Sequence, residues 1–372
     1  MPNQYPKDSG CKNEAVYIHI PFCKSICSYC DFCKMFYNQK WAHAYLLALK
    51  DEINDQYMGE EIQSLYIGGG TPSCLSKKEL EYLMQILKVF KRKKDCEFTF
   101  ECNLNDINEE LLKILKQNGV NRLSIGIESF DEKKLILMGR NHSYEKAKEK
   151  MKLARKFGFD NINLDLIYGF YNETLKTTMN DLKLLLSLDP DHISTYSLIL
   201  SDHTLLSQNK IDVISEDLDA AMYQSICKRL KKKTFNHYEV SNFAKKGKES
   251  KHNLNYWNNG EYYGFGLSAS GYIDGIRYTN TLNLTKYLNG EYTGQKEILT
   301  KKDILDTAIM LGLRKTSGIH LETFKKNYGF PLESAYPILP LLKNKELIKK
   351  KGYIYINPDK LYVMNEILIK LI

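Results

Sequence analysis

Residues 17–33, YIHIPFCKSICSYCDFC, carry a group of closely spaced thiols at the end of an apolar run. Cys23, Cys27 and Cys30 follow a C-x3-C-x2-C spacing directly after residues 15–20, whose apolar side chains are typical of a buried strand. Three thiols this close in sequence can converge on one inorganic centre without help from elsewhere. The stretch therefore predicts a metal or iron–sulfur site.

Six strand-then-helix units extend outward from this stretch. Parallel strands need crossover connections, so such an alternation predicts a parallel sheet with its helices outside. The predicted fold is α/β, a partial (βα)6 TIM-like barrel, with functional side chains at the carboxyl ends of the strands. Strands are predicted at 15–20, 64–67, 97–101, 122–127, 161–168 and 192–200, and helices at 39–57, 77–90, 108–117, 144–157, 175–188 and 217–233.

The chain is longer than the ~300 residues at which one domain usually stops growing. We expect the barrel within residues 1–235. Residues 236–295 are rich in Asn, Tyr and Gly and are predicted to form short antiparallel strands or an elaborated loop region. The remaining segment, 296–372, predicts a small helical and winged-helix-like domain.

The formal net charge of +8 is modest for 372 residues, and the lysines are scattered. No nucleic-acid partner is expected, because a basic stripe with interleaved aromatics is missing. The N-terminal segment lacks the apolar core of a signal peptide, and no apolar run reaches the ~20 residues that cross a bilayer. We expect a cytoplasmic protein with mostly reduced cysteines. A transient contact with a membrane surface is compatible with this location.

Further polar motifs lie where the predicted strands end. The run Gly68 to Gly70 with Thr71 follows the second strand, and Glu101, Glu128 and Asp165 lie at or near the ends of later ones. Each motif has an ordinary alternative: a tight turn for the glycines, salt bridges for the charged residues, and for the thiols a zinc site with Cys33 as fourth ligand. A closed zinc site would leave the glycine run and its strand-end position unexplained.

The sequence Tyr17-Ile-His-Ile-Pro-Phe-Cys, followed by Cys27 and Cys30, resembles the radical S-adenosylmethionine (SAM) superfamily. Within it, the chain is similar to the branch of oxygen-independent coproporphyrinogen III oxidase and the heme chaperone HemW. The resemblance implies a radical SAM barrel with a [4Fe–4S] cluster on the three cysteines and SAM on its open iron. It also implies an electron donor for the cluster, whose electron cleaves SAM to methionine and a 5′-deoxyadenosyl radical.

The same resemblance implies a set of SAM-binding residues. A strand-end carboxylate can accept hydrogen bonds from ribose hydroxyls, and a guanidinium can grip a carboxylate. Glycines let the backbone approach a small molecule closely. Glu128 stands where the family usually has Gln, and an ionised Glu cannot donate a hydrogen bond. The implied cofactor-binding residues are Tyr17, Tyr29, Gly69, Gly70, Thr71, Glu101, Glu128, Arg140 and Asp165.

The second half of the chain separates the branches. His252, Asn253, Tyr256 and Trp257 match an H-N-x-x-Y-W motif of HemW-like proteins, which implies His252 as a heme ligand; a structural hydrogen-bonding role is the alternative. Cys33 is interpreted as a bystander.

The leading hypothesis is a HemW-type chaperone that passes heme to an acceptor protein. The alternatives are coproporphyrinogen III dehydrogenation, an unassigned hydrogen abstraction, or a cluster-bearing scaffold with vestigial SAM chemistry. Two family segments also differ here: the usual G-L-P-G-Q-T reads GFYNET at 169–174, and a usual His is Ser270.

Overall fold

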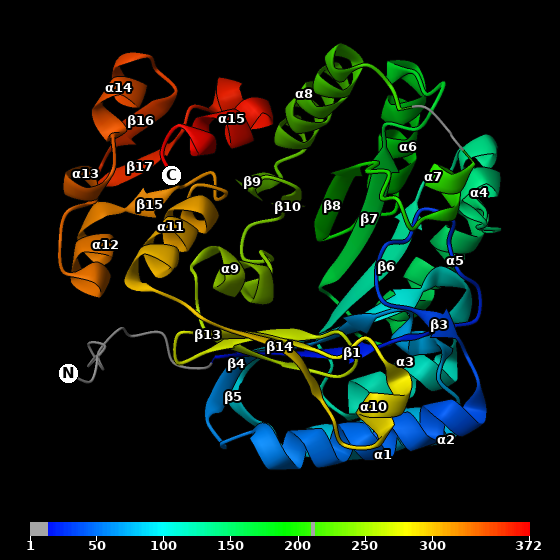
Figure 1. Cartoon of the computed structure of the whole chain (residues 1–372). Helices are drawn as coiled ribbons and strands as arrows, with labels where there is room; N and C mark the ends of the chain where they lie inside the picture. The colour runs from blue at the N-terminus through cyan, green and yellow to red at the C-terminus, as the bar shows by residue number, and fades with distance from the viewer. Residues whose placement is uncertain (1–13, 210–212) are drawn as a thin grey trace.

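The structure, a computed structural model, describes residues 14–209 and 213–372. The sequence predicts no signal peptide in the N-terminal segment. Except for Glu14, this segment lies outside the described residues. A twelve-stranded sheet runs through the molecule in the order β14-β13-β12-β11-β1-β4-β5-β6-β7-β8-β10-β9 (Figure 1). Its centre consists of six parallel strands, which confirms the predicted partial (βα)6 barrel. These strands are β1 (Ala15–Ile20), β4 (Glu61–Gly69), β5 (Lys91–Asn103), β6 (Arg122–Glu128), β7 (Ile162–Tyr168) and β8 (His192–Ser197).

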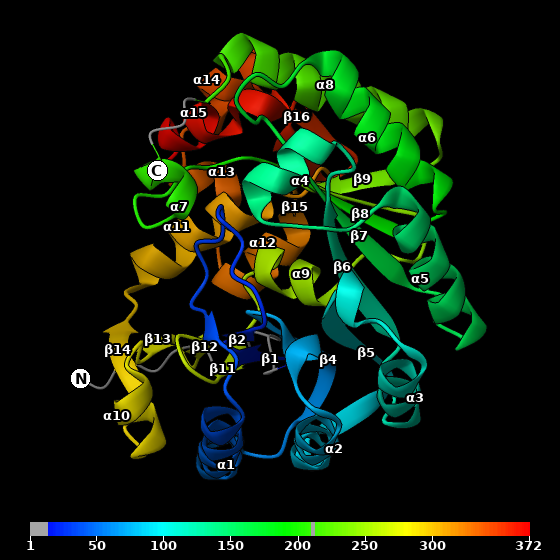
Figure 2. The same ribbon diagram turned by 90° about the vertical axis from the view of Figure 1, so that its right-hand side faces the viewer.

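Helices cover the outside of this barrel in an arc (Figure 2). The apolar faces of most of them meet the strands in one large core, whereas Leu135, Met138 and Leu206 pack in a second, smaller cluster. Side-chain caps fix where several of them begin: Asn38 caps α1, and Ser76 with Glu79 forms a capping box on α2. The barrel helices are α1 (Gln39–Gln56), α2 (Lys77–Ile86), α3 (Glu109–Gln117), α4 (Glu132–Met138), α5 (Tyr144–Lys156), α6 (Leu175–Ser187), α7 (Leu205–Gln208) and α8 (Glu216–Lys232).

The segment predicted to be irregular, 236–295, extends both edges of the same sheet. On one edge β11 (Tyr262–Phe265) runs parallel to β1, and β12 (Ser270–Ile273), β13 (Ile276–Asn280) and β14 (Thr293–Ile298) continue it antiparallel. On the other edge β10 (Asn242–Ala244) and β9 (Asn236–Glu239) follow β8 antiparallel. Two helices, α9 (Lys251–Trp257) and α10 (Leu284–Leu288), interrupt the strands. The His252 motif thus lies on a helix, which corrects the expected loop or strand.

The C-terminal region is small, helical and winged-helix-like, as predicted. An antiparallel sheet in the order β15-β17-β16 packs with short helices, and Tyr362 donates a hydrogen bond from its hydroxyl to the Glu216 carbonyl of α8 at 3.3 Å. Within the described residues, none of the helices combines the length and apolar character needed to cross a bilayer. The elements are α11 (Lys301–Gly312), β15 (Ile319–His320), α12 (Leu321–Tyr328), α13 (Leu332–Ala335), α14 (Ile338–Lys343), β16 (Leu347–Lys350), β17 (Tyr353–Ile356) and α15 (Met364–Ile369).

Candidate cofactor pocket

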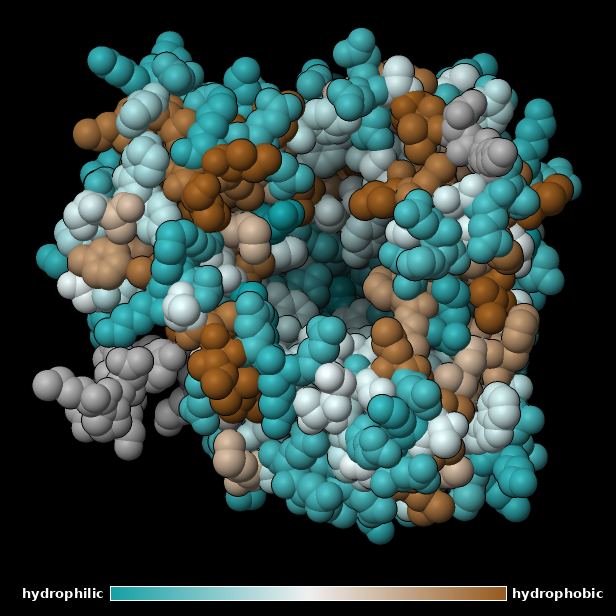
Figure 3. Space-filling model, viewed as in Figure 1, coloured by the Kyte–Doolittle hydropathy of each residue, from teal (hydrophilic) through white to brown (hydrophobic). Residues whose placement is uncertain are grey.

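A pocket of about 420 Å³ opens at the carboxyl ends of the barrel strands. Figure 3 shows this face of the molecule hollowed at its centre, with hydrophilic residues at the bottom of the hollow and hydrophobic patches around it. All but two of the predicted cluster and cofactor residues line the pocket; the exceptions are Tyr17 and His252. The lining residues that the sequence predicted are Cys23, Cys27, Cys30, Tyr29, Gly69, Gly70, Thr71, Glu101, Glu128, Arg140 and Asp165.

The cysteine loop forms one wall of the pocket. Cys23 ends the short strand β2 (Phe22–Cys23), which pairs with β3 (Met35–Phe36) and closes the loop at its base. The Cys30 amide donates to the Cys27 carbonyl at 3.2 Å, and Lys34 Nζ donates to the Cys30 carbonyl at 2.6 Å. The loop backbone is therefore folded so that all three cysteines reach the pocket.

The three thiols have the donor chemistry of an iron–sulfur site, because such clusters are held by cysteine thiolates. Among the residues that the structure describes, no three His, Cys, Asp or Glu side chains are placed to share one metal ion. A [4Fe–4S] cluster would take one thiolate on each of three irons, and Cys23, Cys27 and Cys30 all line the pocket. Burial raises the pKa of the Cys23 thiol to about 11, and iron binding releases such a proton.

The glycine turn packs directly against the cysteine loop. Gly69 has φ +123°, and a Cβ on Gly70 would lie 2.8 Å from Cys23 Sγ, so side chains would push the two segments apart. Thr71 donates from its hydroxyl to Cys23 Sγ at 3.3 Å. Glu101 supports the turn from below, because its carboxylate accepts from the Gly69 amide at 3.2 Å and from the Tyr66 hydroxyl at 2.7 Å. The turn leaves an open cradle beside the thiols.

Glu128 and Arg140 form an ion pair on the opposite wall. Arg140 Nη2 lies 3.1 Å from Glu128 Oε1 and 3.3 Å from the Tyr29 hydroxyl, and Nη1 donates to the Gly126 carbonyl at 2.8 Å. The rim salt bridge that the sequence left as an alternative is thus present. Arg140 Nε has no hydrogen-bond partner among the described side chains and backbone. The pair keeps unused hydrogen-bonding capacity.

The pocket carboxylates are held at unusual pKa values. Burial raises the pKa of Glu128 to about 7, although the Arg140 charge opposes this, and burial raises the pKa of Glu101 to about 7 as well. The pKa of Asp165 is also raised, chiefly by burial, and its carboxylate accepts from Asn163 Nδ2 at 2.8 Å. Glu128 and Glu101 therefore change charge near neutral pH, where a cationic ligand favours their ionised forms.

His252 lies on α9, on the side of the sheet opposite to α1 and α2 (Figure 1), and it does not line the pocket, although the neighbouring Asn253 does. It is 2% exposed, its Nδ1 is 2.9 Å from Ser64 Oγ, and its Nε2 is 2.8 Å from the Tyr256 hydroxyl. Burial lowers its pKa to about 3, so the ring is neutral. Tyr17 is equally engaged, with its hydroxyl 3.0 Å from His19 Nδ1. In this conformation neither ring nitrogen of His252 is free for iron, which favours the structural alternative.

Sequence reasoning missed several residues at the pocket floor. Arg122 is 2% exposed and lines the pocket, and within the described part of the chain its Nε finds no hydrogen-bond partner. The two-residue alternation of a strand gives the signal, because side chains two apart point to the same face. On β6 this face carries Arg122, Ser124, Gly126 and Glu128 in turn. Other lining residues that the sequence did not predict include Tyr66, Asn163, Ser194, Tyr196 and, nearer the mouth, Ile199; Asn253 was noted only as part of the His252 motif.

Comparisons with known proteins place this fold and this pocket in a class. The radical SAM superfamily model matches residues 17–185. The solved structure of coproporphyrinogen III oxidase (HemN) from Escherichia coli, a radical SAM enzyme, superposes with a TM-score of 0.84 over 97% of this chain and 91% of that chain, at 23% identity. That similarity is one of fold.

Closer relatives define the family. Heme chaperone HemW of Lactococcus lactis is 38% identical over 359 residues, which cover 92% of this chain and 93% of that protein. Heme chaperone HemW of Bacillus subtilis is 37% identical over 95% of this chain and 96% of that protein. The chain therefore belongs to the HemW family of radical SAM proteins.

Proposed function

We propose that this chain is a heme chaperone of HemW type, which holds a [4Fe–4S] cluster, SAM and heme and delivers heme to an acceptor protein. The observation that carries the proposal is the 38% identity to a heme chaperone HemW over more than nine-tenths of both chains. The pocket supports it, since thiols, a glycine cradle and charged groups surround one cavity.

Cys23, Cys27 and Cys30 are the proposed cluster ligands. When bound, the cluster supplies the electron that reductive cleavage of SAM requires. Replacing any of the three with Ala is expected to abolish the ~400 nm absorption of a cysteine-ligated cluster. Cys33→Ala is the matched control and is expected to leave that absorption intact, because Cys33 lies outside the pocket lining. A cluster retained in the first three variants contradicts the ligand assignment.

The remaining wall residues are proposed to hold SAM. The turn at Gly69 and Gly70 brings backbone close to the thiols, while Glu101 fixes the turn and presents a carboxylate to the cavity. Arg140 offers a guanidinium with unused donor capacity, and Glu128 offers a charge that can balance a sulfonium or ammonium. Tyr29, Thr71 and Asp165 complete the proposed contacts.

We place heme at the pocket mouth, away from His252. Phe32 and Ile199 line the pocket yet are 70% and 78% exposed, so they offer apolar surface to a flat macrocycle. The two loops that carry them are joined by a hydrogen bond of 2.7 Å from Ser201 Oγ to Asp31 Oδ2. Heme bound there would remain accessible to an acceptor.

Anaerobic heme titration of the cluster-loaded protein tests the function. A Soret shift that saturates near one equivalent is expected, and Phe32→Asp is expected to weaken it. Phe36→Asp is the matched control, because Phe36 is 64% exposed but lies outside the pocket lining. No Soret shift would refute heme binding. Incubating the same preparation with coproporphyrinogen III distinguishes the chaperone from the dehydrogenase. The dehydrogenase would form a decarboxylated product, and the chaperone would not.

A further inference from the structure

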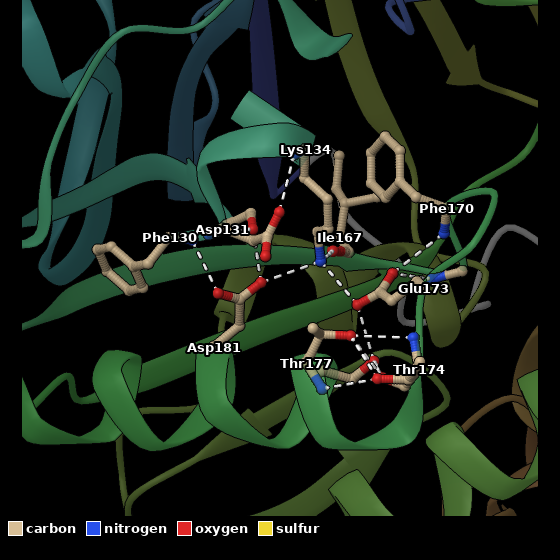
Figure 4. A network of polar contacts seen from close by, with 12 residues as sticks. Phe130, Asp131, Lys134, Ile167, Phe170, Glu173, Thr174, Thr177 and Asp181 are labelled. Carbon is tan, nitrogen blue, oxygen red and sulfur yellow. Dashed lines mark hydrogen bonds and ion pairs between the residues drawn. The ribbon is translucent and has the colours of Figure 1, made fainter. Parts of the chain in front are cut away.

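A second group of charges is buried directly behind the pocket wall. Lys134 on α4 is 5% exposed, and its Nζ lies 2.7 Å from Glu173 Oε1, 2.9 Å from Asp181 Oδ2 and 3.2 Å from the Ile167 carbonyl (Figure 4). Both carboxylate side chains are 1% exposed. We call Lys134, Glu173 and Asp181 the Lys134 cluster. It joins α4, the β7 end and α6 at one point.

The other hydrogen bonds of Asp181 come from the loop that follows β6. Its Oδ1 accepts from the Phe130 amide at 2.9 Å, and its Oδ2 accepts from the Ser129 hydroxyl at 2.5 Å. Ser129 Oγ in turn accepts from the Asp131 amide at 3.0 Å. One carboxylate on α6 therefore fixes the three residues that come directly after Glu128.

Glu173 likewise accepts hydrogen bonds from the loop that follows β7 and holds it in place. Its Oε2 accepts from the Gly169 amide at 2.9 Å and from the Phe170 amide at 3.0 Å, and its Oε1 accepts from Thr178 Oγ1 at 2.7 Å. Through Lys134 this loop is tied to the one after β6. The ends of the two neighbouring strands are thus fixed relative to each other.

The fixed loop matters because Glu128 has a left-handed backbone. Its φ is 66°, a region that non-glycine residues enter at a cost of about 1–2 kcal/mol, so the surrounding structure must impose it. In that conformation the side chain meets Arg140 at 3.1 Å. The Ser129 carbonyl also lies 3.2 Å from His142 Nε2, two residues after Arg140, so the same loop touches both segments of the pair.

Stability alone is a weak explanation for such a cluster, because buried ion pairs often add little net stability. We propose that the Lys134 cluster is a positioning device: Asp181, acting through Ser129 and Phe130, holds Glu128 against Arg140 and thereby sets the affinity for SAM. This inference rests on the proposed SAM-binding role of the pocket. The cluster itself touches no ligand.

Asp181→Asn is the sharpest test. The amide oxygen can still accept from Phe130, while the NH2 group cannot accept from Ser129 or pair with Lys134. SAM binding to the cluster-loaded protein, measured by equilibrium dialysis, is expected to weaken roughly tenfold. Asp191→Asn is the matched control. Asp191 is also buried, accepts from the Ile162 amide at 3.0 Å and pairs with Arg155, but it lies at the amino end of β8.

A double-mutant cycle separates positioning from general destabilisation. Glu128→Gly removes the side chain and tolerates the positive φ. If Asp181 acts through Glu128, Asp181→Asn causes no further loss of SAM affinity in the Glu128→Gly background. Equal losses in both backgrounds, or a loss of the same size in Asp191→Asn, overturn the proposal.

Two further results complete the test. If Asp181→Asn fails to fold, Ser129→Ala removes the same hydrogen bond without touching a buried charge and is expected to weaken SAM binding in the same direction. Unchanged affinity in that variant overturns the inference. If Glu128→Gly itself leaves SAM binding unchanged, the assignment of the Glu128 and Arg140 pair to SAM is wrong, and the positioning role falls with it.

Discussion

Two buried ion groups, the Lys134 cluster and the pair of Glu128 and Arg140, lie side by side at the ends of β6 and β7. They differ in how many of their polar atoms have a hydrogen-bond partner. In the Lys134 cluster all four carboxylate oxygens accept hydrogen bonds from the chain itself. In the pocket pair, Arg140 Nε has no partner in the described part of the chain, and burial raises the pKa of Glu128 to about 7. A complete set of bonds holds the surrounding loops in place, whereas an incompletely bonded pair whose residues line a cavity can still bind a ligand.

The largest contrast is expected in stability. Lys134→Met leaves two buried carboxylates without their cation and is expected to lower the free energy of unfolding by about 3–5 kcal/mol. Arg140→Met is expected to lower it far less, because Glu128, with its pKa of about 7, can take up a proton at little cost. Urea unfolding of the holoprotein at pH 7 measures both. Equal losses would show that the two groups do not differ as described.

For SAM affinity we expect the reverse order, with the larger loss on substitution in the pair of Glu128 and Arg140. Arg140→Gln keeps a polar side chain but removes the guanidinium, and SAM affinity is expected to fall by about 10- to 100-fold, or ~1.4–2.8 kcal/mol. The melting temperature is expected to stay close to that of the unsubstituted protein. Equilibrium dialysis with SAM and a thermal melt on one preparation test this. If the melting temperature falls while SAM affinity is unchanged, the pair of Glu128 and Arg140 stabilises the fold and does not bind SAM.

The contrast also explains what the sequence could predict. The thiols, the glycine turn and the parallel strands were readable because each is a local pattern of adjacent or alternating residues. Lys134 was not singled out, since its partners lie 39 and 47 residues further along the chain and α4 itself was not predicted. Glu173, noted only as a departure from the family's usual Gln, gains a reason in its contact with Lys134.

His252 shows the limit of a motif match: the motif predicts a heme ligand, which stays a prediction, while the structure buries the ring and hydrogen-bonds both of its nitrogens. Whether a side chain is buried depends on how α9 docks against β4, and Ser64 and Tyr256 then take both ring nitrogens. Such long-range docking leaves no trace in a six-residue motif. The domain limits at 235 and 295 were drawn from composition and stay a prediction.

His252 therefore offers a smaller test of the same division between fold and ligand. His252→Gln loses at least one of the two side-chain bonds and is expected to cost about 1 kcal/mol in the free energy of unfolding. Stoichiometric heme binding is expected to persist, because the proposed heme surface lies at Phe32 and Ile199. A lost Soret shift in a fully stable variant would return His252 to the role of heme ligand.

SAM binding is also expected to depend on pH, with a sign opposite to that of stability. Burial raises the pKa of Glu128 from its ordinary value of 4.5 to about 7, so the folded protein binds more protons than the unfolded chain between these values. The contribution of Glu128 to stability accordingly falls as pH rises from 4.5 to 7. A cationic ligand favours the ionised carboxylate, so SAM affinity is expected to rise with pH, by roughly tenfold between pH 6 and 8.

Glu128→Gln separates this contribution from the others. Glu101, whose pKa burial also raises to about 7, remains in that variant, so a weaker rise is expected and not a flat profile. Lys134, Glu173 and Asp181 stay unchanged as well, which keeps the loop after β6 in place. If the full rise survives in Glu128→Gln, the carboxylate that senses SAM is Glu101 or Asp165, and the incomplete group in the pocket does not include Glu128.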